Sequence, residues 1–124
     1  MKFSEISYER PDLETLRQDL TAVLDRFQTA PDYDAAESAY LEMDRVFGRY
    51  MTQQVIANIR RDIDTRDPFY EGEKAWYNQV GPELQPLRKA WVRATLASPF
   101  RSQLEKTYGA TSFLNNELSL KTFS

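Results

Sequence analysis

Hydrophobic residues recur every three or four positions along most of this chain, which is the spacing of one face of an α-helix. After an extended arm over residues 1–10, whose apolar side chains are expected to dock on a neighbouring surface, the pattern predicts a helix from Pro11 to about Thr29. A second pattern predicts a helix from Tyr33 to Asp64. At ~1.5 Å per residue this second helix is roughly 45 Å long.

The hydrophobic stripe of the second helix changes course near Gly48. Its first part ends at Tyr50, and its second part is spaced by four residues: Met51, Val55, Ile59 and Ile63, with Ile56 alongside. Because steps of four drift around a helix that holds 3.6 residues per turn, the two halves are expected to bury different faces. Gly48 is expected to allow close contact between helices.

A very short connection is predicted between the second helix and a third. Asp67 is a typical N-cap and Pro68 a typical first helical residue, which leaves only Thr65 and Arg66 for the turn after Asp64. Such a turn forces the two helices to lie antiparallel and in contact. The predicted fold is therefore all-α, an antiparallel helical bundle built on a long helical hairpin, with all 124 residues in a single domain.

The third helix is predicted to carry a heptad-like seam, interrupted by Pro82 and Pro86. The seam consists of Tyr70, Tyr77, Leu84 and Trp91, interleaved with Val80, Leu87 and Ala94 and widened by Phe69 and Trp76. Proline removes one backbone hydrogen bond and kinks a helix. Because the seam keeps its phase across both prolines, one kinked helix is favoured over two separate helices.

Two short helices are predicted at the end of the chain. One follows Ser98-Pro99 and stops before Gly109, and Thr111-Ser112 can cap the other. The last residues include the apolar Leu120 and Phe123. Because domains usually taper into polar residues, this ending favours a piece cut from a longer protein.

Composition removes several classes of function. The formal net charge is −3, with a pI of about 5.0, which disfavours a nucleic-acid partner. The absence of cysteine excludes disulfides and thiolate chemistry, and the absence of histidine excludes a histidine-based triad. No signal peptide and no run of membrane-spanning length is recognisable, so a cytoplasmic location without a membrane partner is expected.

Two sets of residues could take part in binding. An acidic group could hold a hard cation, although pairing with Arg60 and Arg61 and capping by Asp67 are favoured. That group consists of Asp62, Asp64, Asp67 and Glu71. Four aromatic residues could line an interface or a cleft, although at helical spacing a packing role is favoured: Tyr70, Trp76, Tyr77 and Trp91.

The order and spacing of several short segments resemble the amino-terminal helical region of oligoendopeptidase F, a zinc metallopeptidase of the M3 class. The matching segments are Met1–Ile6 with Tyr8–Asp12, Ile63–Thr65 with Asp67, Phe69-Tyr70 and Glu73, Ser98–Arg101 with Leu104-Glu105 and Tyr108-Gly109, and Leu120–Ser124. The resemblance covers essentially the whole chain. It also gives the turn residues Asp64, Thr65, Asp67 and Pro68 a structural role in the hairpin.

The resemblance implies a non-catalytic helical domain that forms part of the wall of a substrate cleft. Enzymes of this family bind zinc through His-Glu-x-x-His and a further glutamate, a motif that a chain without histidine cannot contain. No catalytic residue, metal ligand or cofactor is therefore expected here, and zinc is expected in the full-length enzyme. The implied partners are the catalytic domain of the same polypeptide and an oligopeptide substrate.

The alternative interpretation is a stand-alone helical interaction or dimerisation module. A homodimer is also expected for this chain alone, because the second helix has apolar residues on two faces and the remaining helices are too short to cover both.

Overall fold

The computed structural model describes residues 7–63 and 68–123, and their side chains as far as Ser119. Within these residues five helices follow one another and no strand is present. They are α1 (Leu13–Gln28), α2 (Tyr33–Ile63), α3 (Pro68–Ala97), α4 (Arg101–Tyr108) and α5 (Thr111–Phe123). The predicted all-α fold is confirmed, with helix boundaries within two residues of those expected. The predicted turn and cap residues Asp64, Thr65, Arg66 and Asp67 lie outside the described residues.

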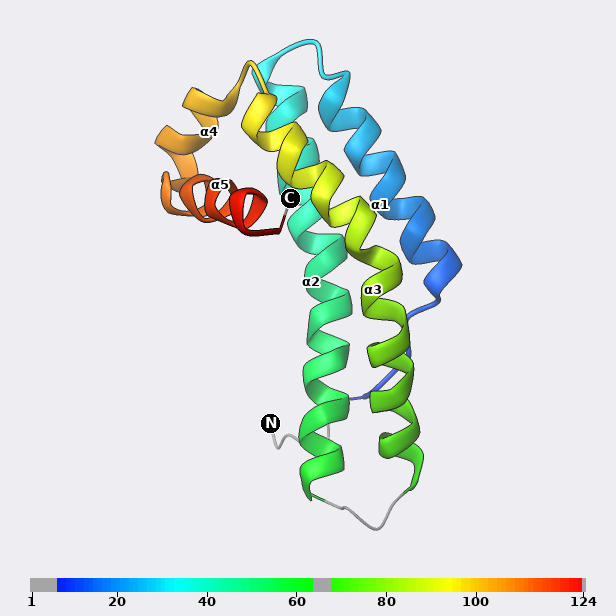
Figure 1. The fold of residues 1–124 in the computed structure, drawn as a ribbon. Coiled ribbons are helices and arrows are strands. Elements are labelled where there is room, and N and C mark those ends of the chain that lie inside the picture. Colours follow the sequence, from blue (N-terminus) through cyan, green and yellow to red (C-terminus); the bar gives the residue numbers. More distant parts are fainter. Residues whose placement is uncertain (1–6, 64–67, 124) are drawn as a thin grey trace.

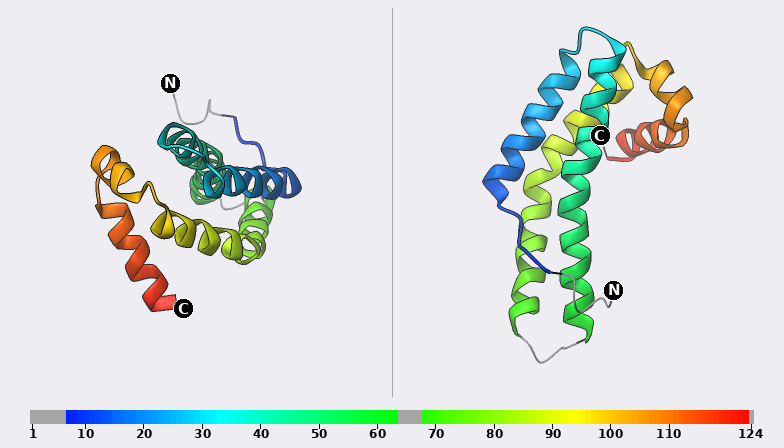
Figure 2. Two further views of the ribbon diagram at one scale, coloured as in Figure 1. Left: turned by 90° about the horizontal axis from the view of Figure 1, so that it is seen from above. Right: turned by 180° about the vertical axis from the view of Figure 1, so that it is seen from behind.

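The long hairpin organises the molecule. Helices α2 and α3 run side by side and antiparallel, and α1 packs along the half of the hairpin that lies away from its turn (Figure 1). The two further views show the other half of the hairpin extending beyond α1, with the segment before α1 continuing along it (Figure 2). Residues 7–10, the described part of the predicted arm, are in neither a helix nor a strand.

The core lies where α1 meets the hairpin. Helix α1 contributes one stripe of its surface, because its apolar residues recur at intervals of three and four. The buried apolar residues of the three long helices are Leu16, Leu20, Val23 and Phe27 from α1, Ala36, Ala39, Met43, Val46, Tyr50, Ile56 and Ala57 from α2, and Tyr77, Val80 and Leu84 from α3.

The ends of α1 and α2 follow from their flanking residues. Asp12 precedes α1 with an extended backbone, and its carboxylate accepts from the Thr15 hydroxyl at 2.7 Å. Asp32 precedes α2, and its Oδ1 accepts from the backbone N–H of Ala35 at 2.8 Å. That bond satisfies one of the backbone donors that a helix start leaves free.

The third helix is continuous through both prolines, as the seam predicted. Pro82 and Pro86 both lie inside α3, and the axis of α3 changes direction along its length (Figure 1). The seam residues are buried or packed against the core, except Phe69, which is 54 % exposed. Retaining the seam keeps the apolar side chains on the bundle side, which offsets the backbone hydrogen bonds that proline cannot make.

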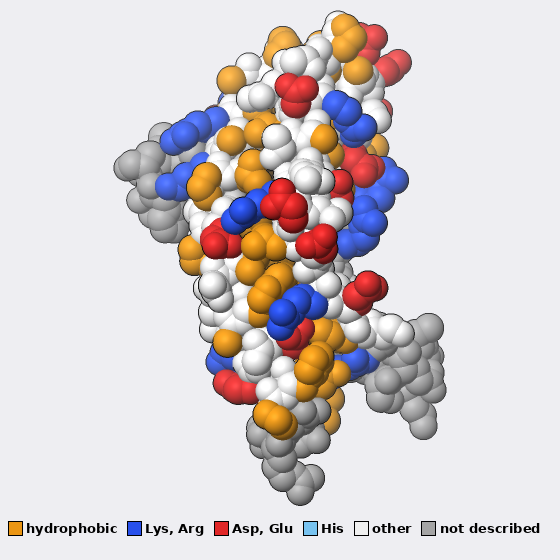
Figure 3. Space-filling view, turned by 90° about the vertical axis from the view of Figure 1, so that its right-hand side faces the viewer, with side chains coloured by type: hydrophobic (Ala, Val, Ile, Leu, Met, Phe, Trp, Pro, Cys, Tyr) orange, Lys and Arg blue, Asp and Glu red, His pale blue; other side chains and the backbone are white. Residues whose placement is uncertain are grey.

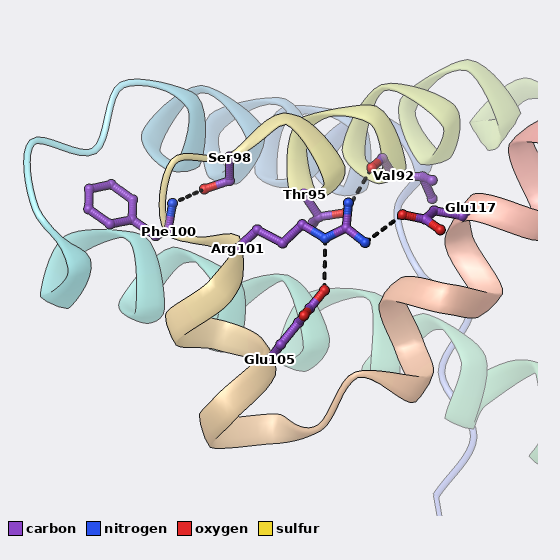
Figure 4. Close-up of polar contacts among 7 residues, drawn as sticks. All are labelled: Val92, Thr95, Ser98, Phe100, Arg101, Glu105 and Glu117. Atoms are coloured by element: carbon purple, nitrogen blue, oxygen red, sulfur yellow. Dashed lines mark hydrogen bonds and ion pairs between the residues drawn. The ribbon is translucent and has the colours of Figure 1, made fainter.

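Helices α4 and α5 fold back beside α3. Gly109 ends α4 with φ of +93°, a conformation that side chains with a Cβ rarely adopt. Arg101, at the start of α4, links both helices: its guanidinium donates to Glu105 at 2.8 Å and to Glu117 at 2.5 Å (Figure 4). Leu104 and Phe113 are almost fully buried beneath this contact.

Two expectations for α2 are wrong. The residues expected to form its second buried stripe are exposed in this chain: Met51, Val55, Ile59 and Ile63. Ile56, which was expected alongside them, is buried, and so is Ala57, because the extended arm and α3 approach α2 from the side on which these two residues lie. Gly48 makes no close helix contact, since an added Cβ would meet nothing within 4 Å.

Candidate functional site

A buried carboxylate anchors the extended arm to the hairpin. Glu73 of α3 is only 2 % exposed. The Tyr8 hydroxyl donates to its Oε1 at 2.6 Å, and Arg10 donates to the same oxygen through Nε at 3.1 Å and forms an ion pair with Oε2. The hydroxyls of Tyr8 and Tyr77 lie 3.2 Å apart. Gln53 of α2 completes the attachment, because its side-chain oxygen accepts from the backbone N–H of Glu9 at 2.9 Å.

These contacts set the charge states of the cluster. The hydrogen bond from Arg10 is the main cause that lowers the pKa of Glu73, although burial opposes it. Burial and the bond to Glu73 raise the pKa of Tyr8. The cluster therefore holds one carboxylate and one guanidinium, both charged and mutually paired. A carboxylate occupied by three donors is poorly suited to act as a base, so the arrangement indicates an anchor for the arm.

The sequence analysis named Glu73 within the family resemblance but did not assign it this role. A signal was present, because Glu73 stands seven residues before Val80 and so occupies a seam position of α3. A charge at a buried seam position needs a partner. The partners, Tyr8 and Arg10, are more than sixty residues away, and sequence spacing alone could not identify them.

The four candidate aromatic residues do not form one site. Tyr77 is buried, whereas Tyr70 and Trp76 lie partly buried near the arm. The Tyr70 ring centroid is 6.0 Å from that of Tyr8, and the Arg10 guanidinium lies 5.0 Å from the Trp76 ring centroid. These contacts place the three aromatics in packing roles around the arm.

Trp91 lies at the other end of α3, beside a pocket of about 240 Å³ between α2, α3 and α5. Its ring centroid is 4.8 Å from that of Phe27 and 6.1 Å from that of Tyr40. Arg88 lies at the same pocket, with its guanidinium 5.0 Å from the ring centroid of Phe47. Burial raises the pKa of Tyr40, which keeps its hydroxyl neutral. The lining mixes apolar side chains with polar ones, among them Asp44 and Asn116, and none of the sequence-predicted candidates other than Trp91 lies at it.

The turn half of α2 carries an exposed hydrophobic surface. We call it the α2 apolar face, and it consists of Met51, Val55, Ile59 and Ile63, with exposed fractions between 39 % and 74 %. Residues 50–59 include no charged side chain. On the side of the molecule that lies to the right in Figure 1, hydrophobic side chains reach the surface among charged ones (Figure 3). Exposed hydrophobic surface without interspersed charge is typical of interfaces.

The described members of the acidic group pair with arginine. Arg61 lies 3.1 Å from Asp62 and 3.5 Å from Glu71, so it links the end of α2 to the start of α3. The other two members, Asp64 and Asp67, lie outside the described residues. Among the residues that are described, no cluster of three metal-ligating side chains occurs. None of the described helices is both long and apolar enough to span a membrane.

The model of the Peptidase M3 N-terminal domain family matches residues 3–123. The chain belongs to this family. A Pz peptidase A, solved with an inhibitor, is 38 % identical to this M3 N-terminal domain and superposes with a TM-score of 0.93 over 99 % of it. Two chains named as oligoendopeptidase F are 35 % and 30 % identical with the same TM-score, the second from Bacillus anthracis strain Ames. No curated protein matches the chain.

The match covers only a small part of each solved structure. The M3 N-terminal domain described here spans 22 % of the Pz peptidase A chain, and 22 % and 23 % of the two oligoendopeptidase F chains. The resemblance inferred from short sequence segments is therefore confirmed over the whole chain. It is confirmed for an amino-terminal domain of this family.

Proposed function

We propose that this chain is the non-catalytic amino-terminal part of a zinc metallopeptidase that cleaves oligopeptides, and that it forms part of the wall around the substrate cleft. The observation that carries the proposal is the family match over residues 3–123, together with the 22 % share of the solved relatives. A domain of this family occurs as one piece of a longer peptidase, so the catalytic part of the same polypeptide is its partner.

Zinc does not fit the residues of this chain. Zinc in peptidases is held mainly by imidazole nitrogens, with a carboxylate as a further ligand. The sequence has no histidine and no cysteine, and Asp62 and Glu71, the described members of the acidic group, are paired with Arg61. The metal of the parent enzyme would therefore be bound entirely by residues outside this chain, and the chemical step takes place there.

The contribution of this chain is a rigid wall. Its long hairpin is braced by α1 along one half and by the arm along the other, and the buried charge of Glu73 is fully paired. Such bracing suits a cleft that admits short peptides and excludes folded proteins, because exclusion by size requires the domains around the cleft to be rigid. A cytoplasmic location is part of the proposal, since oligopeptides arise there from protein turnover.

The experiment uses the full-length parent protein. Chelator-sensitive cleavage of a quenched fluorogenic oligopeptide is expected, with one zinc per chain after dialysis and no cleavage of a folded protein. The 124-residue chain alone should bind no zinc and cleave no peptide. A full-length protein without zinc-dependent cleavage contradicts the proposal, and so does cleavage by the 124-residue chain.

The second candidate is a stand-alone interaction or dimerisation module. The exposed α2 apolar face favours it, because such a surface can pair two copies. Reading the gene onward from the codon for Ser124 distinguishes the two candidates. A continuing frame that encodes His-Glu-x-x-His supports the peptidase, whereas a stop codon supports the module.

A further inference from the structure

The α2 apolar face has the shape of a helix-packing surface. Its four residues are spaced by four along α2, so they form one of the ridges by which helices interlock. The ridge starts at Met51 and ends at Ile63, a rise of roughly 18 Å at ~1.5 Å per residue. That length is enough for the contact region of two crossing helices.

The surroundings of the face distinguish it from an ordinary exposed hydrophobic residue. Leu41, in the other half of α2, is 41 % exposed, and Val55 of the face is 50 % exposed. Leu41 stands beside Glu42, which forms an ion pair with Arg45 at 2.7 Å. Val55 instead stands within a segment, residues 50–59, that has no charge at all. Water therefore solvates the neighbours of Leu41 well and those of Val55 poorly.

No described element of this chain covers the face. Helix α3 and the arm contact α2 through the side of Gln53, Ile56 and Ala57, and α1 lies along the other half of the hairpin. In the similar solved structures, this fold accounts for only 22 % or 23 % of the chain, so more than three quarters of each lies outside it. A large amount of further polypeptide is thus available to cover the face.

We infer that the α2 apolar face is the surface on which the catalytic part of the same polypeptide packs, through an apolar and uncharged helix. This inference rests on the proposed function. Ridges formed by residues four apart interlock with similar ridges at a crossing angle of about −50°. The partner helix is therefore expected to cross α2 obliquely, with its own hydrophobic residues spaced by four.

A second copy of the chain is a weaker occupant. A stable interface between separate chains buries about 800 Å² and 20–30 residues on each side, whereas this face offers four residues. A segment of the same polypeptide is held near the face at an effective concentration in the millimolar range, so a small interface is enough.

The test measures accessibility in the full-length parent protein. The chain has no cysteine, so Val55→Cys and Leu41→Cys each introduce one thiol into it, and peptide mapping separates these thiols from others in the parent. Labelling by a maleimide is expected to be at least tenfold slower at Val55→Cys than at Leu41→Cys in the native protein. In denaturant the two rates should be equal. Replacing Val55 by cysteine removes little volume, so folding is expected to be preserved.

Three results would overturn the inference. Equal labelling rates in the native protein mean that the face is open. Slow labelling that becomes fast on dilution means that a second copy covers it. If labelling of Val55→Cys is slow only when an oligopeptide is present, the face lines the substrate cleft. Each result is independent of peptidase activity, so a failure of the proposed function is recognised separately by the absence of zinc-dependent cleavage.

Discussion

Replacing Arg10 by methionine tests the anchor of the arm. The substitution removes the guanidinium but keeps most of the apolar stem that passes Trp76. It leaves the carboxylate of Glu73 buried and retains the hydrogen bond that the Tyr8 hydroxyl donates to it. Breaking a buried ion pair from one side usually costs 3–5 kcal/mol, because an uncompensated charge stays behind.

The expected loss is smaller than that range. The side chain of Arg10 is 47 % exposed, so water screens the pair and lowers its contribution. Loss of the contact with Trp76 adds about 0.5–1 kcal/mol. We expect the free energy of unfolding at pH 7 to fall by about 2 kcal/mol. In urea denaturation, where m is about 1–3 kcal/mol/M, the midpoint should fall by roughly 1 M.

The loss of unfolding free energy caused by Arg10→Met should be smaller at acidic pH than at neutral pH. The folded-state pKa of Glu73 lies below its ordinary value, chiefly because Arg10 donates to it. The stabilisation is therefore fully present above the unfolded pKa and is lost as the pH falls through the folded pKa. Without Arg10, burial raises the pKa of Glu73, and protonation removes the unpaired charge. The difference between the two proteins should accordingly be largest at neutral pH and shrink below pH 4.

The matched control is Arg17→Met, which breaks an ion pair to Glu83 that spans 3.1 Å with both side chains more than 40 % exposed. Exposed pairs contribute about 0–1 kcal/mol. If both substitutions cost the same, the burial of Glu73 has no energetic consequence. If the cost of Arg10→Met grows in acid, the assignment of the charge to Glu73 is wrong.

Three further substitutions or measurements follow. Asp32→Ala removes the acceptor for the Ala35 N–H and should cost about 1 kcal/mol in chemical denaturation; an unchanged midpoint would show that this cap contributes nothing. Gly48→Ala adds a Cβ into open space within α2 and should raise the free energy of unfolding by about 0.5–1 kcal/mol; a destabilised variant would reveal a contact. The 124-residue chain alone should self-associate weakly through the α2 apolar face, and sedimentation velocity at increasing micromolar concentrations measures this association. Ile59→Lys should abolish the association, whereas the control Leu41→Lys should leave it intact.

The helices could be predicted because the sequence signals that define a helix lie within it or directly beside it. The N-cap and proline positions and the spacing of hydrophobic residues are all contained within each helix. The phase of the α3 seam was sufficient to predict a single helix through Pro82 and Pro86. The turn that joins α2 to α3 was predicted from the same kind of local pattern, but it lies outside the described residues.

The arm anchor and the true burial of α2 could not be predicted from the sequence. Glu73 depends on Tyr8 and Arg10, which only the folded chain brings near it. For α2, periodicity indicates which residues share a face but not which face receives a neighbour. The residues on the drifting stripe were therefore expected to be buried, although α3 and the arm pack against the side that contains Ile56 and Ala57.

A long helix with two apolar faces requires two partners. The residues of α2 that were wrongly expected to be buried within this chain are therefore available to the partner that the proposed function implies. One face of the turn half of α2 is covered by α3 and by the arm that Glu73 holds in place. The other face carries exposed hydrophobic residues, and from Tyr50 to Ile59 no charged residue stands among them. A helix surrounded by water on that side would be expected to carry charged residues beside Met51 and Val55, as α2 does beside Leu41. This pattern is the one expected if a further segment of polypeptide packs on the α2 apolar face, as inferred above.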